Sequence, residues 1–288
     1  MNTSPPAPTG EHPSSTVRAG GLWVVATPIG NLGDLAPRAI ETLRDVDLIL
    51  AEDTRHSRPL LQHFNVATPM QALHDHNEAQ AVPGLVARML DGQRMALISD
   101  AGTPLVSDPG FRLVHAARAA GVAVSPVPGP SALIAALSVA GIASDRFCFE
   151  GFLPAKAGAR REQIARLRSE TRTLVFYESA HRILESLHDL AEGFGDQRRI
   201  AVARELTKRF ETVLDGTLSQ VLQRVASDAD QQRGEFVLVV EGAGDDADAR
   251  LAEGRRLYAK LAEYLAPSQA ARLAAELSGA PRKALYGG

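Results

Sequence analysis

The chain has 288 residues, of which 45% are hydrophobic and 23% charged, and its formal net charge is −3. This composition is that of a globular protein long enough for two compact domains and an appendage. The acidic balance excludes a protein that coats nucleic acid through a general excess of positive charge. The single cysteine, Cys148, excludes a disulfide framework within one chain.

Residues 1–20 lack aromatic side chains and hydrophobic periodicity, so we expect a disordered tail there. They contain no apolar core of the kind that a signal peptide needs. No apolar run in the chain is long enough to span a bilayer. We therefore expect a cytoplasmic protein.

Short β-like runs alternate with helical patterns from Leu22 onward. This βαβ alternation predicts a first α/β domain at residues 21–143. The predicted strands cover residues 22–26, 48–51, 95–98 and 122–124, and the predicted helices cover residues 38–44, 79–90, 111–119 and 131–140.

A second series of alternating patterns predicts another α/β domain at residues 144–242. Its predicted strands cover residues 147–149, 174–177, 200–203, 212–214 and 236–240, with helices at 160–168 and 180–190. Residues 243–288 are then a linker and a small C-terminal helical appendage. Gly242–Asp248 resembles a hinge, and helices are expected at 268–277 and 281–286, where Ser268 and Pro281 are natural helix starters. These helices form a hairpin or a helix-turn-helix.

Three loops that follow predicted strands are rich in glycine and proline: residues 27–34, 99–110 and 126–132. The first alone fits equally a ligand loop and a tight turn in which Asp34 begins to cap the helix opened by Pro37. The second is too polar for a simple connector. Because ligands bind beyond the carboxyl ends of parallel strands, where glycine permits close approach, the loops together indicate a cofactor enzyme.

A nicotinamide cofactor is the first alternative. Glu52 and Asp53 lie about twenty residues after the first loop, where a ribose-binding acid would stand. The loop itself, Gly30-Asn31-Leu32-Gly33, lacks the G-x-G-x-x-G fingerprint. An oxidoreductase therefore remains the weaker interpretation.

Nine segments occur in one order across residues 25–242: ATPIGNLGDL, AEDTRHS, HDHNE, ISDAGTPLVSDPG, PVPGPSA, GFLPAK, FYESAHR, ARELTK and GEFVLVVEG. With them the chain closely resembles the family of small-subunit ribosomal RNA methyltransferases that methylate a cytidine 2′-hydroxyl in 16S rRNA. The resemblance implies the tetrapyrrole methylase fold, with two α/β domains, S-adenosylmethionine (SAM) bound in the cleft between them, and a homodimer. It covers nearly all of the chain except residues 1–20.

The same resemblance implies which residues contact SAM. They are Pro28, Gly30, Asp100, Gly102, Thr103, Val106, Ser131 and Ala132 in the first domain and Tyr177 and Phe236 in the second. Many tetrapyrrole methylases have Gly-Asp-Pro where this chain has Gly102-Thr103-Pro104. Asp100 is close enough to replace the missing acid.

Methyl transfer depends on positioning, and a ribose hydroxyl also needs a base or a nearby cation. The sequence does not identify that group. Four acid–base neighbourhoods are candidates: Asp53 with Arg55, Glu78 beside His76, Glu178 with His181 and Arg182, and Glu205 with Arg204 and Lys208. Such neighbours are most often surface ion pairs. We select Glu178 and Glu205 as the predicted catalytic residues.

The segment His74–Glu78 has side chains that could ligate a metal. Such polar residues are also common where a strand leads into a helix, with Asn77 as the cap for Glu78 onward. No second cluster completes a coordination sphere. We predict no metal.

Residues 153–210 contain twelve Lys and Arg against eight Asp and Glu, in a chain that is acidic overall. A solvated helix face explains such a bias by default, but the family resemblance favours contact with RNA phosphates. Arg272, Arg282, Lys283 and Tyr286 either add RNA contacts or lie on packed helices. The predicted RNA-binding residues are Arg55, Lys156, Arg160, Arg161, Arg182, Arg204, Lys208 and Arg209.

Two other functions remain open beside the leading one and the oxidoreductase. A methylase of the same fold could act on a tetrapyrrole or another small acceptor. A non-catalytic RNA-binding assembly factor could keep the fold and the basic face without turnover. The aromatic content of 5% disfavours a free single-strand binder, so assembled 16S rRNA or the small ribosomal subunit is the expected partner.

Overall fold

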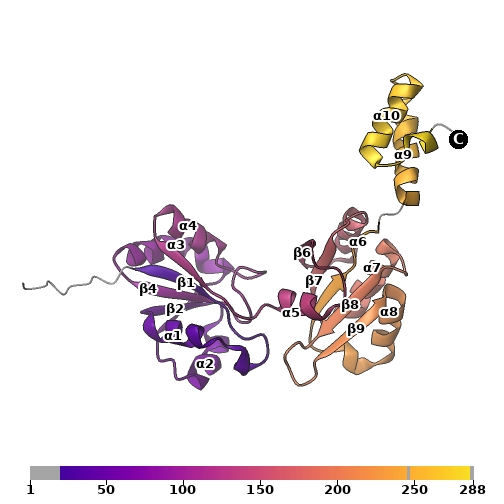
Figure 1. Cartoon of the computed structure of the whole chain (residues 1–288). Coiled ribbons are helices and arrows are strands. Elements are labelled where there is room, and N and C mark those ends of the chain that lie inside the picture. The colour runs from indigo at the N-terminus through magenta and orange to yellow at the C-terminus, as the bar shows by residue number, and fades with distance from the viewer. Residues whose placement is uncertain (1–19, 245–246, 286–288) are drawn as a thin grey trace, which may run out of the picture. The chain divides into compact units, whose positions relative to one another are not determined.

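The computed structural model describes residues 20–244 and 247–285, and the predicted tail lies almost wholly outside them (Figure 1). The chain divides into two compact units. The first comprises the described residues up to Ser138 together with the segment Glu205–Thr212. The second comprises Val139–Arg204 and the described residues from Val213 onward. No sequence pattern had indicated that Glu205–Thr212 belongs with the first unit.

The first unit has a five-stranded sheet in the order β3-β2-β4-β1-β5, in which every neighbouring pair is parallel. Its strands are β1 (Gly21–Val25), β2 (Leu48–Ala51), β3 (Met70–Ala72), β4 (Arg94–Ile98) and β5 (Ala123–Val127). Its helices are α1 (Pro37–Asp45), α2 (Thr54–His63), α3 (Asp75–Leu90), α4 (Phe111–Ala119) and α5 (Ala132–Val139), the last of which ends in the second unit.

Helices cover both faces of this sheet, because the buried strands carry apolar side chains in both directions. On one face, side chains of α1 and α2 pack with Val25, Ile49 and Ile98. On the other face, side chains of α3 and α4 pack with Leu22 and Leu97. The predicted α/β architecture is confirmed for this unit.

Two capping predictions in this unit were wrong. Asp34 ends a short 3-10 helix (Leu32–Asp34), and α1 begins after Ala36, which makes no side-chain cap. Helix α3 begins at Asp75, earlier than predicted. Asn77 therefore lies in its first turn, where its Oδ1 accepts a hydrogen bond of 2.9 Å from the His74 amide.

The second unit has a mixed sheet in the order β6-β7-β10-β8-β9. Strand β6 is parallel to β7, whereas β10 is antiparallel to both β7 and β8. Helices α6, α7 and α8 cover one face, where Phe176, Leu187 and Leu238 are fully buried. The elements are β6 (Phe147–Phe152), α6 (Ala157–Leu167), β7 (Thr173–Ser179), α7 (Ile183–Phe194), β8 (Arg199–Arg204), β9 (Thr212–Thr217), α8 (Leu218–Ser227), a 3-10 helix (Ala229–Gln232) and β10 (Glu235–Val240).

The C-terminal region is helical, as predicted, with α9 (Ala247–Leu261), α10 (Pro267–Ser278) and α11 (Arg282–Leu285) packed on one another around Ala274. A Cβ on Gly254 would lie 2.8 Å from Ser278 Oγ and 2.9 Å from Leu285 Cδ2, so glycine is needed for this close approach. Helix α10 begins at Pro267, not Ser268. Tyr286 lies outside the described residues.

Within the described ranges we find no helix with the length and apolarity of a membrane span.

Candidate functional site

The loops that follow β1 and β4 are hydrogen-bonded to each other at the carboxyl edge of the first sheet. The Thr27 amide donates to the Gly102 carbonyl at 2.8 Å, and the Gly102 amide donates back to the Thr27 carbonyl at 3.1 Å. The buried Thr27 hydroxyl also donates to the Ser99 carbonyl, at 3.2 Å. The first two glycine-rich loops therefore form one rigid rim, as expected for strand ends that share an edge.

The loop that follows β5 joins the same rim. The Thr103 hydroxyl donates to the Pro130 carbonyl at 2.9 Å, so this threonine ties two loops together. Gly102 has φ +82°, and a Cβ there would lie 3.3 Å from Ile29 Cγ2. All of the predicted SAM contacts in the first unit lie on these three loops or, for Ala132, at the first residue of α5: Pro28, Gly30, Asp100, Gly102, Thr103, Val106, Ser131 and Ala132.

Several carboxylates lie close to one another at this edge of the sheet. The Asp53 amide donates to Asp100 Oδ1 at 3.2 Å. Burial raises the pKa of Glu52, and the charges of Asp108 and Asp100 raise it further. Burial also raises the pKa of Asp108 to about 6. A hydrogen bond from Ser99 lowers this pKa in part, and the charge of Asp100 raises it. The sequence alone gave no sign that Asp108 would face Asp100.

This edge fits the cofactor that the resemblance implies. SAM carries positive charges on its sulfonium and amino groups, and mutually repelling carboxylates are stabilised by a cation placed between them. The positive φ of Gly102 leaves the backbone open where a side chain would otherwise stand. Asp100, Glu52 and Asp108 are the acidic groups that would hold the cationic parts of SAM.

The other two predicted SAM contacts lie in the second unit. Phe236, on β10, is only 2% exposed and packs in the core. Tyr177, on β7, is half-buried, and its ring centroid lies 4.8 Å from that of Phe149 and 5.6 Å from that of Phe152. Phe236 is thus a core side chain, and only its backbone could contact a ligand.

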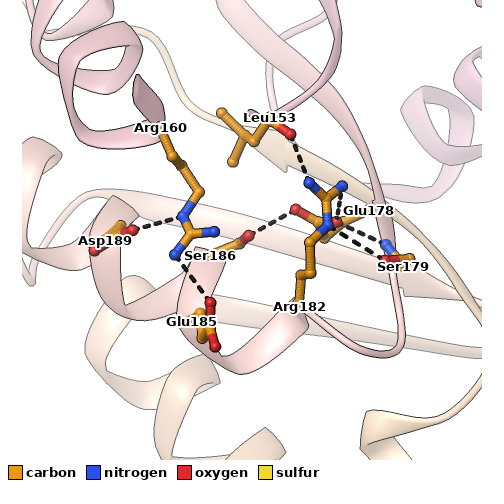
Figure 2. A network of polar contacts seen from close by, with 8 residues as sticks. All are labelled: Leu153, Arg160, Glu178, Ser179, Arg182, Glu185, Ser186 and Asp189. Carbon is orange, nitrogen blue, oxygen red and sulfur yellow. Dashed lines mark hydrogen bonds and ion pairs between the residues drawn. The ribbon is translucent and has the colours of Figure 1, made fainter. Parts of the chain in front are cut away.

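Glu178, one of the two predicted catalytic residues, lies on β7 with no exposed side-chain area. Figure 2 shows its carboxylate surrounded by donors: the Ser179 amide at 2.8 Å, the Ser186 hydroxyl at 2.6 Å and Arg182 Nη2 at 2.6 Å. Arg182 also donates to the Leu153 carbonyl at 2.8 Å. The cluster joins the loop after β6 to the corner between β7 and α7.

We predict that Glu178→Gln lowers the free energy of unfolding by about 1–3 kcal/mol, because the amide nitrogen would face a buried donor. If Glu178 only organises this corner, the methyl-transfer rate measured well below the unfolding transition stays within a few-fold of wild type. A rate loss of a hundred-fold or more in the folded variant would instead identify Glu178 as the base. Urea titration and single-turnover kinetics give the two quantities.

Arg160 lies inside the second unit, with 2% of its side chain exposed. Its Nε donates to Asp189 Oδ2 at 2.5 Å, and its Nη2 pairs with Glu185 Oε2 at 3.2 Å (Figure 2). A guanidinium held in this way does not reach an RNA phosphate. Arg160 is therefore not one of the proposed RNA contacts.

The other predicted RNA-binding residues differ in exposure. Arg204 is buried, with its Nε donating to the Arg233 carbonyl at 2.7 Å, and Arg182 is mostly covered. Arg55 is 88% exposed and pairs with Asp53, which lowers the pKa of Asp53 to about 2. Three other predicted RNA-binding residues are exposed: Lys156, Arg161 and Arg209.

The second predicted catalytic residue, Glu205, lies in the segment that belongs with the first unit. Its Oε1 accepts a hydrogen bond of 2.9 Å from Lys208 Nζ. The stem of Lys208 lies against Gly30, where a Cβ would come within 2.4 Å of Lys208 Cγ. The structure thus brings this carboxylate and ammonium to the first glycine-rich loop.

Within the described ranges, one group of potential metal ligands comes together: His188, Asp189 and Glu192. It is not the segment His74–Glu78 that the sequence singled out. Asp189 already accepts from the Arg160 guanidinium, and a cation would have to displace that pair. Glu78, in the predicted segment, is buried and accepts from the Leu113 amide at 3.1 Å. We assign no metal to either place.

Comparison with protein families and relatives adds to this geometry. The family model "Tetrapyrrole (Corrin/Porphyrin) Methylases" matches residues 21–222, and the model "RsmI C-terminal HTH domain" matches residues 248–287. A protein of Xylella fastidiosa strain Temecula1 named "Ribosomal RNA small subunit methyltransferase I" is 62% identical over 93% of this chain and 98% of its own length. Proteins of the same name from Pseudomonas aeruginosa and Escherichia coli O157:H7 are 53% and 49% identical, over 93% and 96% of this chain and 96% of each relative.

Solved structures agree at the level of the fold. A diphthine synthase has a TM-score of 0.58 at 16% identity, over 77% of this chain and 89% of that protein. A uroporphyrin-III-C-methyltransferase from Thermus thermophilus has a TM-score of 0.54 at 20% identity, over 77% of this chain and 94% of that protein. These two proteins differ in the substrates that their names give. The likeness therefore indicates the fold of this chain but not the molecule on which it acts.

Proposed function

The chain belongs to the tetrapyrrole methylase family, and from this premise we propose that it transfers a methyl group from SAM to the ribose 2′-hydroxyl of a cytidine in 16S rRNA. The observation that carries the proposal is the 62% identity to a small-subunit rRNA methyltransferase over 98% of that relative. The match of residues 248–287 to the C-terminal domain model of the same kind of enzyme supports it. The low-identity structural neighbours do not bear on the acceptor.

The rim of the first unit is the proposed donor site. When bound, SAM supplies a methyl group on a positively charged sulfur that leaves as a neutral thioether. The bridge between Thr27 and Gly102 fixes the loops. Asp100, which already accepts from the Asp53 amide, would hold a cationic or hydroxyl group of the donor. Because the loops are preorganised by hydrogen bonds, little ordering entropy is lost when the donor is held for in-line attack.

Glu205 is the base that we assign to the acceptor hydroxyl. It is the predicted catalytic carboxylate that lies in the same unit as the donor loops, 2.9 Å from the Lys208 ammonium. It would take the hydroxyl proton, and Lys208 would stabilise the negative charge that develops on the ribose oxygen. Glu178, which three donors surround, is assigned a structural role.

Exposed cations are the proposed contacts to RNA phosphates. Lys156 and Arg161 lie at the start of α6, and Arg209 lies in the segment Glu205–Thr212. In the C-terminal helices the proposed contacts are Arg272, Arg282 and Lys283, which are among the exposed cations there. Phosphate contacts position the RNA without reading its sequence. We also propose that the enzyme acts as a cytoplasmic homodimer, as its family resemblance implies.

The test uses the purified full-length chain, SAM and small ribosomal subunits that lack this methyl group. We expect one new 2′-O-methyl mark on a 16S rRNA cytidine, found by mapping ribose methylation. Naked 16S rRNA in a parallel reaction shows whether the assembled particle is required. Particle binding without any new mark would support the non-catalytic assembly factor and overturn the proposal.

A further inference from the structure

The segment Glu205–Thr212 has a strained backbone. Glu205 and Thr207 have φ angles of 52° and 66°, in the left-handed region that side chains other than glycine rarely adopt. Each such residue costs free energy, which the surrounding contacts must offset. The Thr207 amide donates to Glu211 Oε2 at 2.6 Å, and the Lys208 amide donates to the Glu205 carbonyl at 3.0 Å. These bonds hold the segment in one shape.

One side of the segment is fixed to the loop that carries Pro28 and Gly30. A Cβ on Gly30 would lie 2.4 Å from Lys208 Cγ and 3.0 Å from Thr207 Oγ1, so the contact requires glycine. The Thr207 hydroxyl is buried there and has no hydrogen-bond partner within the part of the chain that the structure describes. The strained segment is thereby fixed beside a proposed donor loop.

The segment also presents an exposed aromatic ring next to a cation. Phe210 is 65% exposed, and Arg209 Cζ lies 5.6 Å from the centroid of its ring. The exposed part of this ring is an apolar surface whose burial against another flat group would be favourable. Aromatic rings and guanidinium planes are the surfaces on which unpaired bases of RNA stack, and such stacking strengthens binding.

We propose that Phe210, with Arg209 beside it, stacks on one unpaired base of the substrate RNA and so positions the acceptor nucleotide next to the donor loop. The inference rests on the proposed function and adds the residue that holds the substrate base. Arg209 contributes charge toward the adjacent phosphates. The strained backbone at Glu205 and Thr207 fixes the direction of the Phe210 ring, because a relaxed loop would present that ring in many directions. Phe210 acts as a positioning residue, since it takes no part in bond making.

The experiment compares Phe210→Ala, Phe210→Trp and the control Phe111→Ala in the full-length protein. Phe111 is a matched control because it is also a phenylalanine of the first unit, 69% exposed, and its ring stacks on His115 of its own helix. For each variant, the dissociation constant for undermethylated small subunits, the kcat/KM for methylation and the SAM dissociation constant by calorimetry are measured.

We expect Phe210→Ala to weaken particle binding and lower kcat/KM by about five- to a hundred-fold, which corresponds to the loss of one stacked base. Its affinity for SAM should remain that of wild type. Phe210→Trp should restore both quantities, and its indole fluorescence should be quenched by added subunits beyond the change that Trp23 shows in the wild type. Phe111→Ala should behave as wild type.

Three results would overturn the inference. Particle binding by Phe210→Ala within two-fold of wild type would show that no base stacks there. A parallel loss of SAM affinity would show that the substitution only distorts the donor loop. A change in oligomeric state, seen by analytical ultracentrifugation, would assign the ring to a second copy of the chain. If the wild type itself leaves no mark on the rRNA, the proposed function fails, whereas these results require an active wild type.

Discussion

Replacing Arg160 by alanine is expected to lower the free energy of unfolding by about 3–5 kcal/mol. Asp189 is 6% exposed and would be left buried without the guanidinium that now donates to it at 2.5 Å. Removal of one partner from a buried pair costs more than the pair contributes, because the remaining charge has lost its water as well. Urea unfolding of the full-length protein measures the effect as a shift of the midpoint.

Two further variants test whether the loss of stability comes from the burial of the Arg160–Asp189 pair or from the loss of any ion pair. Arg166→Ala removes an ion pair with Glu162 on the same helix, at 3.4 Å, where both side chains are about 70% exposed, so we expect a change below about 1 kcal/mol. The double variant Arg160→Met with Asp189→Leu should recover most of the loss, since it leaves no unpaired charge. Equal effects of Arg160→Ala and Arg166→Ala would contradict the buried pair.

The substitution Asp100→Ala is expected to weaken SAM binding by about ten- to a hundred-fold, as for the loss of one or two hydrogen bonds to a charged group. Asp100 follows β4 on the rim, half-buried, and its charge contributes to the raised pKa values of Glu52 and Asp108. A carboxylate in that position attracts the cationic donor. Calorimetry with SAM measures the dissociation constant directly.

Asp100→Asn isolates the charge, because its side-chain oxygen can still accept from the Asp53 amide that now donates to Asp100 Oδ1. It should therefore lose affinity for SAM without loosening the loop. Asp91→Ala removes the same charge from an exposed position at the end of α3, before β4 begins, and should bind SAM as wild type does. Unchanged affinity in Asp100→Ala would remove this carboxylate from the donor site.

Local patterns in the sequence were sufficient for most elements. The apolar run at 48–51 and the helical pattern at 111–119 coincide with β2 and α4. The missed elements lack strong patterns: α2 contains Pro59 and many polar residues, and β3 has three residues. Helix α8 was also missed, although Thr217 and Gln220 form a capping box that marks its start. That signal was readable from the sequence.

The sequence by itself determined the two α/β units, the helical C-terminal region, the family and the loops that make up the proposed donor site. Each of these depends on residues that are near one another in the chain, where apolar periodicity, glycine and proline act locally. Only the tertiary structure decided which charged residues are exposed to RNA or near the donor site and which are buried in ion pairs. The sequence predicted an RNA contact for Arg160 and a catalytic role for Glu178, but long-range packing of α6, β7 and α7 buries both among partners. Packing likewise carried Lys208 to Gly30, 178 positions away along the chain, because burial and distant contacts depend on the whole fold.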